Sequence, residues 1–446
     1  MSAGGLRTDD SLSLAAEGRI VDLTPDQRVL LLERRPDAEG ELRRRVTELM
    51  DEVRRDGDAA LVRMARAFDG VELESLEVPR PRWDDALEAI APDVRRELHR
   101  AARNIETFHR AQRPSDVEVE TEPGVRLGRA AVPLSAVGVY APGGRAAYPS
   151  SVLMGVVPAR AAGVREVVVC SPPGPSGTPP TEVLAACAIA GATRLFALGG
   201  AGAVAALAWG TESVPRVQAI VGPGNRWVTE AKRQVAGELR TDAPAGPSEV
   251  LVVAGPGADA GRVAGELVAQ AEHDPDAAVA AVTWNRSLLE EIRQALARQV
   301  DAAPRREIVA RALAARGALL LAASRAEALA FAEGYAAEHL ALFTDDPRRD
   351  LETQTTAGTV FLGESSTVAF GDYMTGANHV LPTAGMGRSF SGLSTLDFLR
   401  FYTWQELSAA GAAGMAEGTA RLAEAEGLPG HAAAARARAE LGEDRP

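Results

Sequence analysis

The spacing of hydrophobic and polar residues divides the chain into a helical first part and a longer part in which strands and helices alternate. Between residues 40 and 112, apolar residues recur at helical spacing among charged ones, which predicts amphipathic helices. His99 and His109 lie in this region beside arginines, and we predict that both sit on solvated helix faces. From residue 136 to 255, short apolar runs such as AVGVY and VREVVVC alternate with helical stretches, and residues 247–390 repeat this theme.

Strands that alternate with helices predict an α/β protein whose sheets are mainly parallel, with helical crossovers. Residues 113–135 alternate between apolar and polar, which predicts a short hairpin or connecting strands. The alanine-rich tail from 394 to 440 is predicted to be helical. The 446 residues allow about two to three domains, and because no low-complexity linker separates them, we predict that they are interleaved.

Composition restricts the classes of function that the chain can have. Its formal net charge of -13 argues against general nucleic-acid binding, which needs a basic face. No apolar run approaches the ~20 residues that span a bilayer, and the first residues lack the features of a secretory signal. The two cysteines, Cys170 and Cys187, cannot form a disulfide framework and lie in apolar runs. They predict buried thiols and a reducing cytoplasm.

Four of the six histidines lie in four polar motifs of the second half, each with a carboxylate. The motifs are QAEH at 270–273, EH at 338–339, GDYMTGANH at 371–379 and EGLPGH at 426–431. Imidazole is the commonest transition-metal ligand and the usual side chain for proton transfer near neutral pH. Imidazoles and carboxylates together suit a divalent metal site with an acid and base pair, so a metalloenzyme is our first hypothesis.

Within these motifs, sequence spacing predicts how some side chains are arranged. Gln270 and His273 are three residues apart at the end of a predicted helix, so they share a face and could bind one metal ion. Asp372 lies in a turn predicted to follow a strand, where active sites of α/β proteins collect. Glu338 and His339 are neighbours in an extended segment, so we predict that they point to opposite sides and act at different steps. Each motif alone would also fit an ordinary turn or helix end, but four together would not.

Glycine-rich turns after predicted strands suggest a nucleotide site of unusual form. The GPGN turn at 222–225 begins a helix whose N–H groups could bind phosphate, although it is not a GxGxxG fingerprint. The GG pairs at 143–144 and 199–200 also follow strands. Tyr140 could stack on a base or a nicotinamide ring, and Ser248, in the loop before a strand, could donate a hydrogen bond to a ligand.

Taken together, these motifs resemble those of the histidinol dehydrogenase family. The resemblance covers roughly residues 40–435, and the motifs occur in the family's order and spacing. The matching stretches are VGVYAPGGRAAYPSSVLM, GTESVP, VGPGNRWVTEAKRQV, PAGPSEVLV, AQAEHDPD, YAAEHLAL, GDYMTGANHVLPTAG and EGLPGH.

This resemblance implies that the chain oxidises L-histidinol to L-histidine through histidinaldehyde and reduces two NAD⁺ in succession. His339 would take the alcohol proton, and Glu338 would activate water for the second oxidation. One zinc ion would orient the substrate, held by Gln270, His273, Asp372 and His431. Besides these ligands, the implied substrate contacts are Ser248, Glu338, His339, His379 and Glu426. The implied NAD contacts are Tyr140, Asn225 and the residue at position 202.

Position 202 departs from the family pattern, because the family usually has glutamine where this chain has Gly202. Loss of a side-chain hydrogen bond is expected to weaken NAD binding by about 1 kcal/mol, or less if water substitutes. A second, softer difference is Gly155, where the family commonly has asparagine. The first difference concerns only the NAD contact and leaves the expected zinc site intact.

The resemblance also implies the domain organisation and a partner. It implies two incomplete Rossmann-like domains with small helical segments at both ends, and an intertwined homodimer in which Glu426 or His431 serves the partner's site. The first domain, carrying the metal and catalytic residues, is predicted at 29–118 and 247–391, and the second, on the NAD side, at 140–246. The remaining parts are an N-terminal segment at 1–28, connecting strands at 119–139 and a C-terminal helical segment at 392–446.

Other functions remain open at the level of sequence. A paralogous zinc-dependent dehydrogenase of another small primary alcohol, such as a sulfonated diol, would share the zinc ligands, but Glu426 suits a cationic amine better than a sulfonate. A zinc hydrolase would use Glu338 without NAD; the GPGN turn and Tyr140 argue against it, while Gly202 leaves it open. A non-catalytic protein would not need both Glu338 and His339. Zinc, manganese and cobalt all accept such ligands, so the sequence does not determine the native metal.

Overall fold

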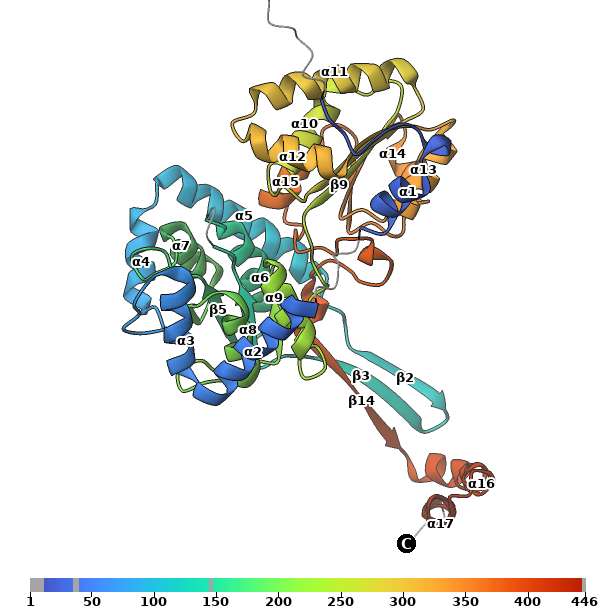
Figure 1. Cartoon of the computed structure of the whole chain (residues 1–446). Coiled ribbons are helices and arrows are strands. Elements are labelled where there is room, and N and C mark those ends of the chain that lie inside the picture. The colour runs from blue at the N-terminus through green and yellow to red at the C-terminus, as the bar shows by residue number, and fades with distance from the viewer. Residues whose placement is uncertain (1–11, 35–39, 144–146, 443–446) are drawn as a thin grey trace, which may run out of the picture.

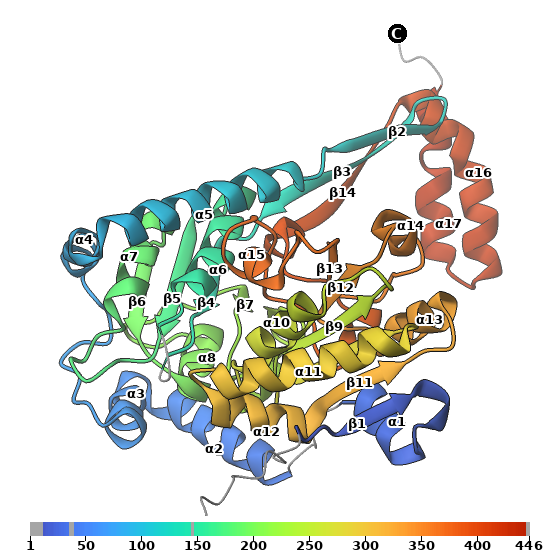
Figure 2. The same cartoon turned by 90° about the horizontal axis from the view of Figure 1, so that it is seen from above.

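The computed structural model describes residues 12–34, 40–143 and 147–442, and within them the strands form three sheets. Two parallel sheets with their helices make up the body of the molecule, and a small antiparallel sheet extends from the body as an arm (Figure 1; Figure 2). This confirms the predicted α/β class with mainly parallel sheets. None of the described helices is long and apolar enough to cross a membrane.

The larger parallel sheet has six strands in the order β1-β11-β10-β9-β12-β13. Its inner strands β9, β10 and β12 are buried at every residue, as expected for a parallel sheet that helices cover on both faces. The strands are β1 (Ala16–Arg19), β9 (Glu249–Ala254), β10 (Ala278–Thr283), β11 (Gly317–Leu321), β12 (His339–Phe343) and β13 (Thr359–Leu362).

Two groups of helices cover this sheet. Residues of β9 alternate between the two resulting cores: Val250 and Val252 pack on one face, Leu251 and Val253 on the other. The first face carries α10 (Ala260–Ala271), α11 (Arg286–Ala302), α12 (Arg306–Arg316) and α15 (Val368–Tyr373). The second face carries α1 (Pro25–Leu32) and α13 (Arg325–Tyr335), with α14 (Pro347–Leu351) beside β12 and β13.

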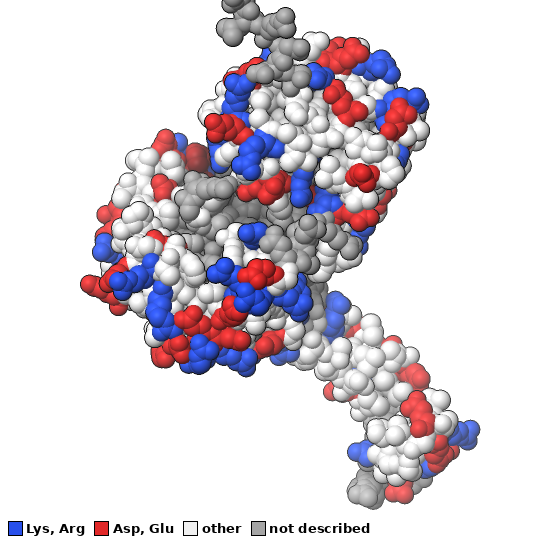
Figure 3. Space-filling model, in the orientation of Figure 1, with Lys and Arg blue, Asp and Glu red and all other residues white. Residues whose placement is uncertain are grey.

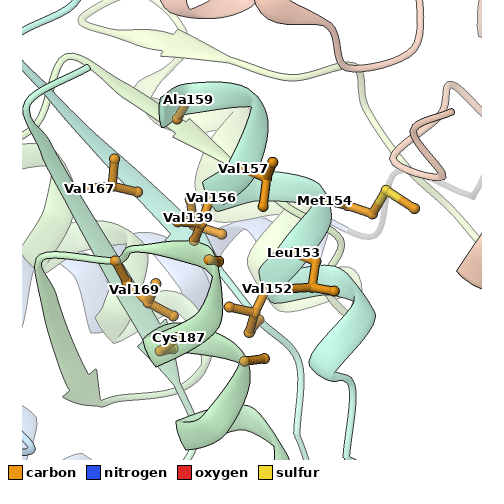
Figure 4. Close-up of a cluster of buried hydrophobic side chains, with 14 of the residues drawn as sticks. Val139, Val152, Leu153, Met154, Val156, Val157, Ala159, Val167, Val169 and Cys187 are labelled. Atoms are coloured by element: carbon orange, nitrogen blue, oxygen red, sulfur yellow. The ribbon is translucent and has the colours of Figure 1, made fainter. Parts of the chain in front are cut away.

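The smaller parallel sheet has five strands in the order β6-β5-β4-β7-β8. Its strands are β4 (Ala136–Tyr140), β5 (Glu166–Ser171), β6 (Arg194–Ala197), β7 (Ala219–Val221) and β8 (Arg240–Thr241). The helices that connect these strands are α6 (Pro149–Ala162), α7 (Thr181–Ala190), α8 (Gly200–Trp209) and α9 (Arg226–Val235). Figure 4 shows part of the core on one face, where Val139 and Val169 meet side chains of α6 and Cys187 of α7.

The helical region near the N-terminus packs on this smaller sheet, which differs from the expected grouping of residues 29–118 with 247–391. The helices are α2 (Gly40–Asp56), α3 (Asp58–Met64), α4 (Arg80–Ala89) and α5 (Pro92–Ala111). Helices α4 and α5 contribute Trp83 and Ile105 to the core around Val139, and α2 and α3 contribute Met50 and Leu61 to the core of the opposite face. The apolar stripes of these helices were predictable, but the sheet that they cover was not.

The arm is an antiparallel sheet, β2-β3-β14, that ends in two helices (Figure 1). Its elements are β2 (Val117–Glu122), β3 (Val125–Pro133), β14 (Leu399–Leu407), α16 (Ala409–Ala425) and α17 (Pro429–Arg436). The hairpin predicted at 113–135 is confirmed as β2 and β3. The prediction of an entirely helical tail is wrong, because β14 pairs along the whole of β3. Gly128 of β3 allows this pairing, since a side chain there would collide with the indole of Trp404.

Short helical turns complete the chain and carry several of its connections. They are η1 (Ile20–Asp22), η2 (Ala65–Asp69), η3 (Met386–Arg388), η4 (Thr395–Phe398) and η5 (Ala439–Gly442). On the face seen in Figure 3, acidic and basic side chains are interspersed over the body, whereas the arm presents a largely uncharged surface.

Candidate active site

The candidate catalytic residues lie at the amino ends of two neighbouring strands of the six-stranded sheet. His339 is the first residue of β12, and it lies opposite Val250, the second residue of β9. Ser248 immediately precedes β9 and is half-buried. The expectation that the site follows strand ends is therefore wrong for this sheet. Asp372 also does not lie in a turn after a strand, because it belongs to α15.

Glu338 and His339 contact each other instead of pointing to opposite sides. Their Oε2 and Nδ1 atoms are 3.4 Å apart, and both side chains are buried. Glu338 lies in a bend before β12 and not within the strand, so the alternation of an extended chain does not apply to it. The backbone of Glu249 links the two: its N–H donates to Glu338 Oε2 at 2.7 Å, and its carbonyl accepts from His339 Nδ1 at 2.9 Å.

Charges around His339 determine its protonation. A carbonyl oxygen only accepts, so Nδ1 carries a proton, and Nε2 lies 3.6 Å from Asp372 Oδ1. Burial disfavours the imidazolium, but the carboxylates of Glu338 and Asp372 outweigh it and raise the pKa of His339 well above its usual value. Burial raises the pKa of Glu338, against the attraction of His339. Burial also opposes ionisation of Asp372, but its three histidine neighbours lower its pKa overall.

His379 lies beside this pair, where the two halves of the body meet. Its Nδ1 donates to the carbonyl of Asp372 at 2.9 Å, and its Nε2 is 3.5 Å from Oγ of Ser151 in the first turn of α6. Burial lowers the pKa of His379, against the attraction of Asp372, so the neutral imidazole is favoured. One small cavity joins these groups; its lining includes His339, Phe361, Asp372, Asn378 and His379.

Two of the predicted metal ligands lie at the end of α10, close to Asp372. Gln270 is buried in the last turn of this helix, and His273 follows just beyond its end. Helices α10 and α15 are joined where the N–H of Val368 donates to Glu266 at 3.0 Å, and the charge of His273 contributes to the lowered pKa of Asp372. The helix predicted to end here is confirmed as α10, whereas the prediction that Gln270 and His273 share a face and bind one metal ion stays a prediction.

The remaining predicted residues of this site, Glu426 and His431, are not brought to it. Both are exposed, Glu426 just after the end of α16 and His431 in the first turn of α17, at the far end of the arm from α10 and α15 (Figure 1; Figure 2). Among the residues that the structure describes, no group of three His, Cys, Asp or Glu side chains is close enough to hold a metal ion. Within one chain, His273 lies within electrostatic range of Asp372, whereas His431 lies away from both, and the predicted ligand set stays a prediction.

The candidate NAD residues surround the point where the strand order of the five-stranded sheet reverses, between β4 and β7. Ligands of open α/β sheets bind beside such a point, at the carboxyl ends of the strands. Tyr140 ends β4, and its ring packs in the core while its hydroxyl accepts from the N–H of Gly200 at 3.1 Å. Asn225 is exposed and caps α9, because its Oδ1 accepts from the N–H groups of Trp227 and Val228. Gly144, from one of the predicted glycine-rich turns, lies outside the described residues.

A buried ion pair holds the GPGN turn. The Nζ of Lys232 donates to the carbonyl of Gly222 at 3.0 Å and pairs with Asp242, and Asp242 Oδ2 accepts from the N–H of Gly222 at 2.7 Å. Gly222 has φ +112°, and a side chain there would collide with the carbonyl of Tyr140. The backbone N–H and the backbone carbonyl of Gly222 are therefore both held, the first by Asp242 after β8 and the second by Lys232 of α9.

Position 202 does not face this turn. Gly202 is buried within α8, and a Cβ atom there would lie 2.9 Å from the sulfur of Met64 and 3.3 Å from Leu61 of α3. Gly155 is equally confined, since a Cβ atom would collide with Val139. The two positions that depart from the family pattern thus lie where elements pack closely, Gly155 of α6 against β4 and Gly202 of α8 against α3. An added side chain at 202 would point at α3.

Sequence reasoning missed several residues that support the site. His109 is fully buried, contrary to the prediction of a solvated face; its Nδ1 donates to the carbonyl of Ile105 at 2.9 Å. Its Nε2 is 3.5 Å from the amide of Asn378, which also donates to the carbonyl of Met154 at 2.8 Å. The signal was present, because Ala101, Ile105 and His109 are four residues apart and share the buried face of α5.

Comparison with known proteins gives one family. The sequence profile of the histidinol dehydrogenase family matches residues 32–439. The chain is 46% identical to a histidinol dehydrogenase from Methanosarcina mazei over 88% of this chain and 91% of that protein. It is 47% identical to one from Halobacterium salinarum over 94% and 98%. The crystal structure of histidinol dehydrogenase from Elizabethkingia anophelis superimposes with a TM-score of 0.90 at 32% identity, covering 95% of this chain and 97% of that one.

Proposed function

The chain belongs to the histidinol dehydrogenase family, and we propose that Glu338 and His339 carry out its reaction, the NAD-dependent oxidation of L-histidinol to L-histidine. The observation that carries this assignment is the buried contact between the two side chains, both held by the backbone of Glu249. A histidine and a carboxylate with different surroundings suit a reaction that needs two bases at successive steps.

We propose that His339 is the base of the first oxidation. Its Nδ1–H is held by the carbonyl of Glu249, so in the neutral imidazole the lone pair is on Nε2, toward the cavity with Asp372 and His379. As the alcohol carbon loses a hydride to NAD⁺, Nε2 accepts the hydroxyl proton and histidinaldehyde forms.

Glu338 is the proposed base of the second oxidation. The aldehyde takes up water to form a hydrate, with Glu338 accepting a proton, and the hydrate then loses a second hydride to NAD⁺ to give the carboxylate. Burial raises the pKa of Glu338, which makes its carboxylate a stronger base than an exposed one. A thiol route is disfavoured: Cys170 and Cys187, the two cysteines of the chain, are both fully buried in the core, which raises the pKa of each.

Zinc is the proposed metal, held by Gln270, His273 and Asp372 of one chain together with His431 of a second chain. Amide oxygen, imidazole and carboxylate suit zinc, and Gln270 is buried in the last turn of α10. When bound, the ion orients the substrate and stabilises negative charge on it. If Asp372 bound the ion, its negative charge would be neutralised and would no longer stabilise the imidazolium of His339. The pKa of His339 would then fall, which favours the neutral base.

A homodimer is proposed to complete the site. All residues of β2 are exposed, and the arm carries exposed apolar side chains, which mark a surface for protein contact; they include Val117, Val119, Phe401, Tyr402, Leu407, Leu422 and Leu428. Glu426 and His431 lie at the end of this arm, away from the site of their own chain (Figure 2). We therefore assign them to the site of a second copy, where Glu426 contacts the cationic end of the substrate.

NAD is proposed to bind at the carboxyl ends of β4 and β7. The side-chain amide of Asn225 and the hydroxyl of Tyr140 are the side-chain groups assigned to it, and Ser248 and His379 are assigned to the substrate. Gly202 is not included, because a side chain at this position would point at α3. A cytoplasmic location stays a prediction that rests on the two thiols.

The measurement that tests this proposal is the amount of NADH formed for each L-histidinol consumed by the metal-replete protein. We expect a ratio near two, lost when the metal is removed with a chelator and restored by zinc. A ratio near one with release of aldehyde would contradict the role of Glu338. NADH formation that persists after complete metal removal would contradict the metal site.

A further inference from the structure

The backbone of one residue outside the assigned catalytic set holds both catalytic side chains. The N–H of Glu249 donates to Oε2 of Glu338 at 2.7 Å, and its carbonyl accepts from Nδ1 of His339 at 2.9 Å. A shift of this residue would therefore move the base of the first oxidation and the base of the second together. The groups that hold Glu249 in place therefore affect both steps of the reaction.

The side chain of Glu249 is an acid at the start of an otherwise apolar buried strand. It is 2% exposed, and an unpaired carboxylate in such a place is strongly unfavourable. Arg34 pairs with it through two parallel contacts, Nε to Oε1 at 2.9 Å and Nη2 to Oε2 at 3.1 Å. The N–H of Ala384, in the loop after His379, also donates to Oε1, at 2.8 Å.

Arg34 connects this carboxylate to the segment that leads into Glu338. It lies just beyond α1, its Nη2 donates to the carbonyl of Tyr335 at 2.8 Å, and its guanidinium stacks on the Tyr335 ring at 3.6 Å from the centroid. Its Nη2 is also 3.4 Å from the carbonyl of Ala336, two residues before Glu338. One guanidinium therefore ties the start of β9 to the turn that precedes β12.

We propose that Arg34 and Glu249 form a positioning pair for the catalytic residues. The pair orients the peptide of Glu249 and the turn before Glu338, and thereby the two side chains that act on the substrate. Neither member lines the cavity beside His339, so both act through other groups. This inference rests on the proposed roles of Glu338 and His339, and it makes both steps depend on Arg34, which follows α1.

A second ion pair in the same domain provides a matched control. Arg325 and Asp350 also form two parallel contacts, each 2.9 Å, and Asp350 is buried. Asp350 accepts from the hydroxyl of Thr344, which follows β12 at its carboxyl end, so this pair lies at the opposite edge of the sheet from the catalytic residues. The Arg325 side chain is partly exposed, so loss of this pair reports what a partly buried ion pair contributes to stability without contact with the site.

The test compares double variants in the full-length, zinc-loaded protein. Arg34→Met with Glu249→Leu replaces the first pair by apolar side chains, which removes the ion pair without leaving a buried unpaired charge. Arg325→Met with Asp350→Leu does the same for the control. Measurements are the melting temperature, zinc content, and kcat and KM for oxidation of L-histidinol and, separately, of histidinaldehyde.

We expect the first double variant to lose about 100-fold in kcat for both substrates, the size of effect that a misplacement of about 1 Å causes. Its KM for L-histidinol and its zinc content should stay within about threefold of the parent, and the control should keep its kcat at a similar melting temperature. An unchanged kcat in the first variant, or an equal loss in the control, would overturn the proposal.

Two single variants keep the test decisive if the double variant does not fold. Glu249→Gln keeps the shape and the acceptor for Ala384 but loses the charge, and we expect it to lower kcat without raising KM. A Glu249→Gln enzyme with the parent kcat would overturn the positioning role. Glu338→Gln separates this outcome from failure of the proposed function: if it oxidises histidinaldehyde normally, the assignment of Glu338 is wrong, whatever the pair does.

Discussion

Placing glutamine at position 202 tests whether the NAD site of this chain follows the family pattern. If a glutamine there contacted NAD, Gly202→Gln would add a hydrogen bond worth about 1 kcal/mol and lower the KM for NAD about fivefold. The structure predicts a different result. A Cβ atom at 202 would lie 2.9 Å from the sulfur of Met64 and 3.3 Å from Leu61, so the new side chain meets α3 first.

The magnitude follows from two opposing effects. Inserting a side chain into this packed contact costs about 1–3 kcal/mol, and replacing glycine within a helix recovers about 0.5 kcal/mol. The net loss is therefore about 0.5–2.5 kcal/mol, which lowers the melting temperature by about 2–4 °C per kcal/mol in a domain of ordinary size. We expect no gain in NAD affinity from the single substitution.

The assay combines the melting temperature with the KM for NAD at saturating L-histidinol. A second variant, Gly202→Gln with Met64→Ala, removes the side chain that a Cβ atom at 202 would meet first, with Met64→Ala alone as the control. We expect the double variant to be more stable than the sum of the two single effects, because the collision is relieved. A single Gly202→Gln variant with a parental melting temperature and a fivefold lower KM for NAD would refute this reasoning.

Three further predictions concern other parts of the molecule. Lys232→Met leaves the carboxylate of Asp242 buried and unpaired, so we expect a stability loss of about 3–5 kcal/mol and a higher KM for NAD; an unchanged KM would contradict the role of this pair in shaping the GPGN turn. Burial lowers the pKa of His109, so its contribution to stability is complete above the unfolded pKa of about 6.5 and is lost as the pH falls toward the folded value. When the pH is lowered from about 7.5 to about 5.5, the melting temperature of His109→Leu should therefore fall by less than that of the parent. Equal decreases in the two proteins would argue against a neutral buried histidine. His431→Ala and His339→Asn, each inactive alone, should regain activity when dissociated and reassembled together, because one site of the mixed dimer then has both native residues; no recovery would count against a shared site.

Local spacing determined much of the fold and part of the site. The alternation of apolar strands with helices predicted both parallel sheets, and the period-two pattern at 113–135 predicted the hairpin β2–β3. The helix predicted to end near Gln270 and His273 is present as α10, which ends at Ala271. These predictions succeed because helix and strand geometry repeats over a few residues, so the sequence itself contains both the pattern and its consequence.

The tertiary structure alone decided which surfaces meet. An amphipathic stripe shows that a helix is covered but not by which sheet, and so α2–α5 were assigned to the wrong sheet and His109 to solvent. The strand β14 forms because β3, more than 260 positions earlier, offers it a partner edge. Burial and pairing of this kind depend on contacts between distant segments, which local periodicity does not encode.

The chemistry of the site divides in the same way. The residue types that suit proton transfer and zinc binding were visible in the sequence, as was the acid at the start of an apolar strand, Glu249. Its partner was not, because Arg34 lies 215 positions away and meets it only after α1 packs on the six-stranded sheet. The contact of Glu338 with His339 depends equally on a bend before β12. The sequence thus determined which chemical groups were available. Folding determined which of them meet: Glu338 and His339 both bond to the backbone of Glu249, Arg34 pairs with the side chain of Glu249, and His339 lines the same cavity as Asp372 and His379.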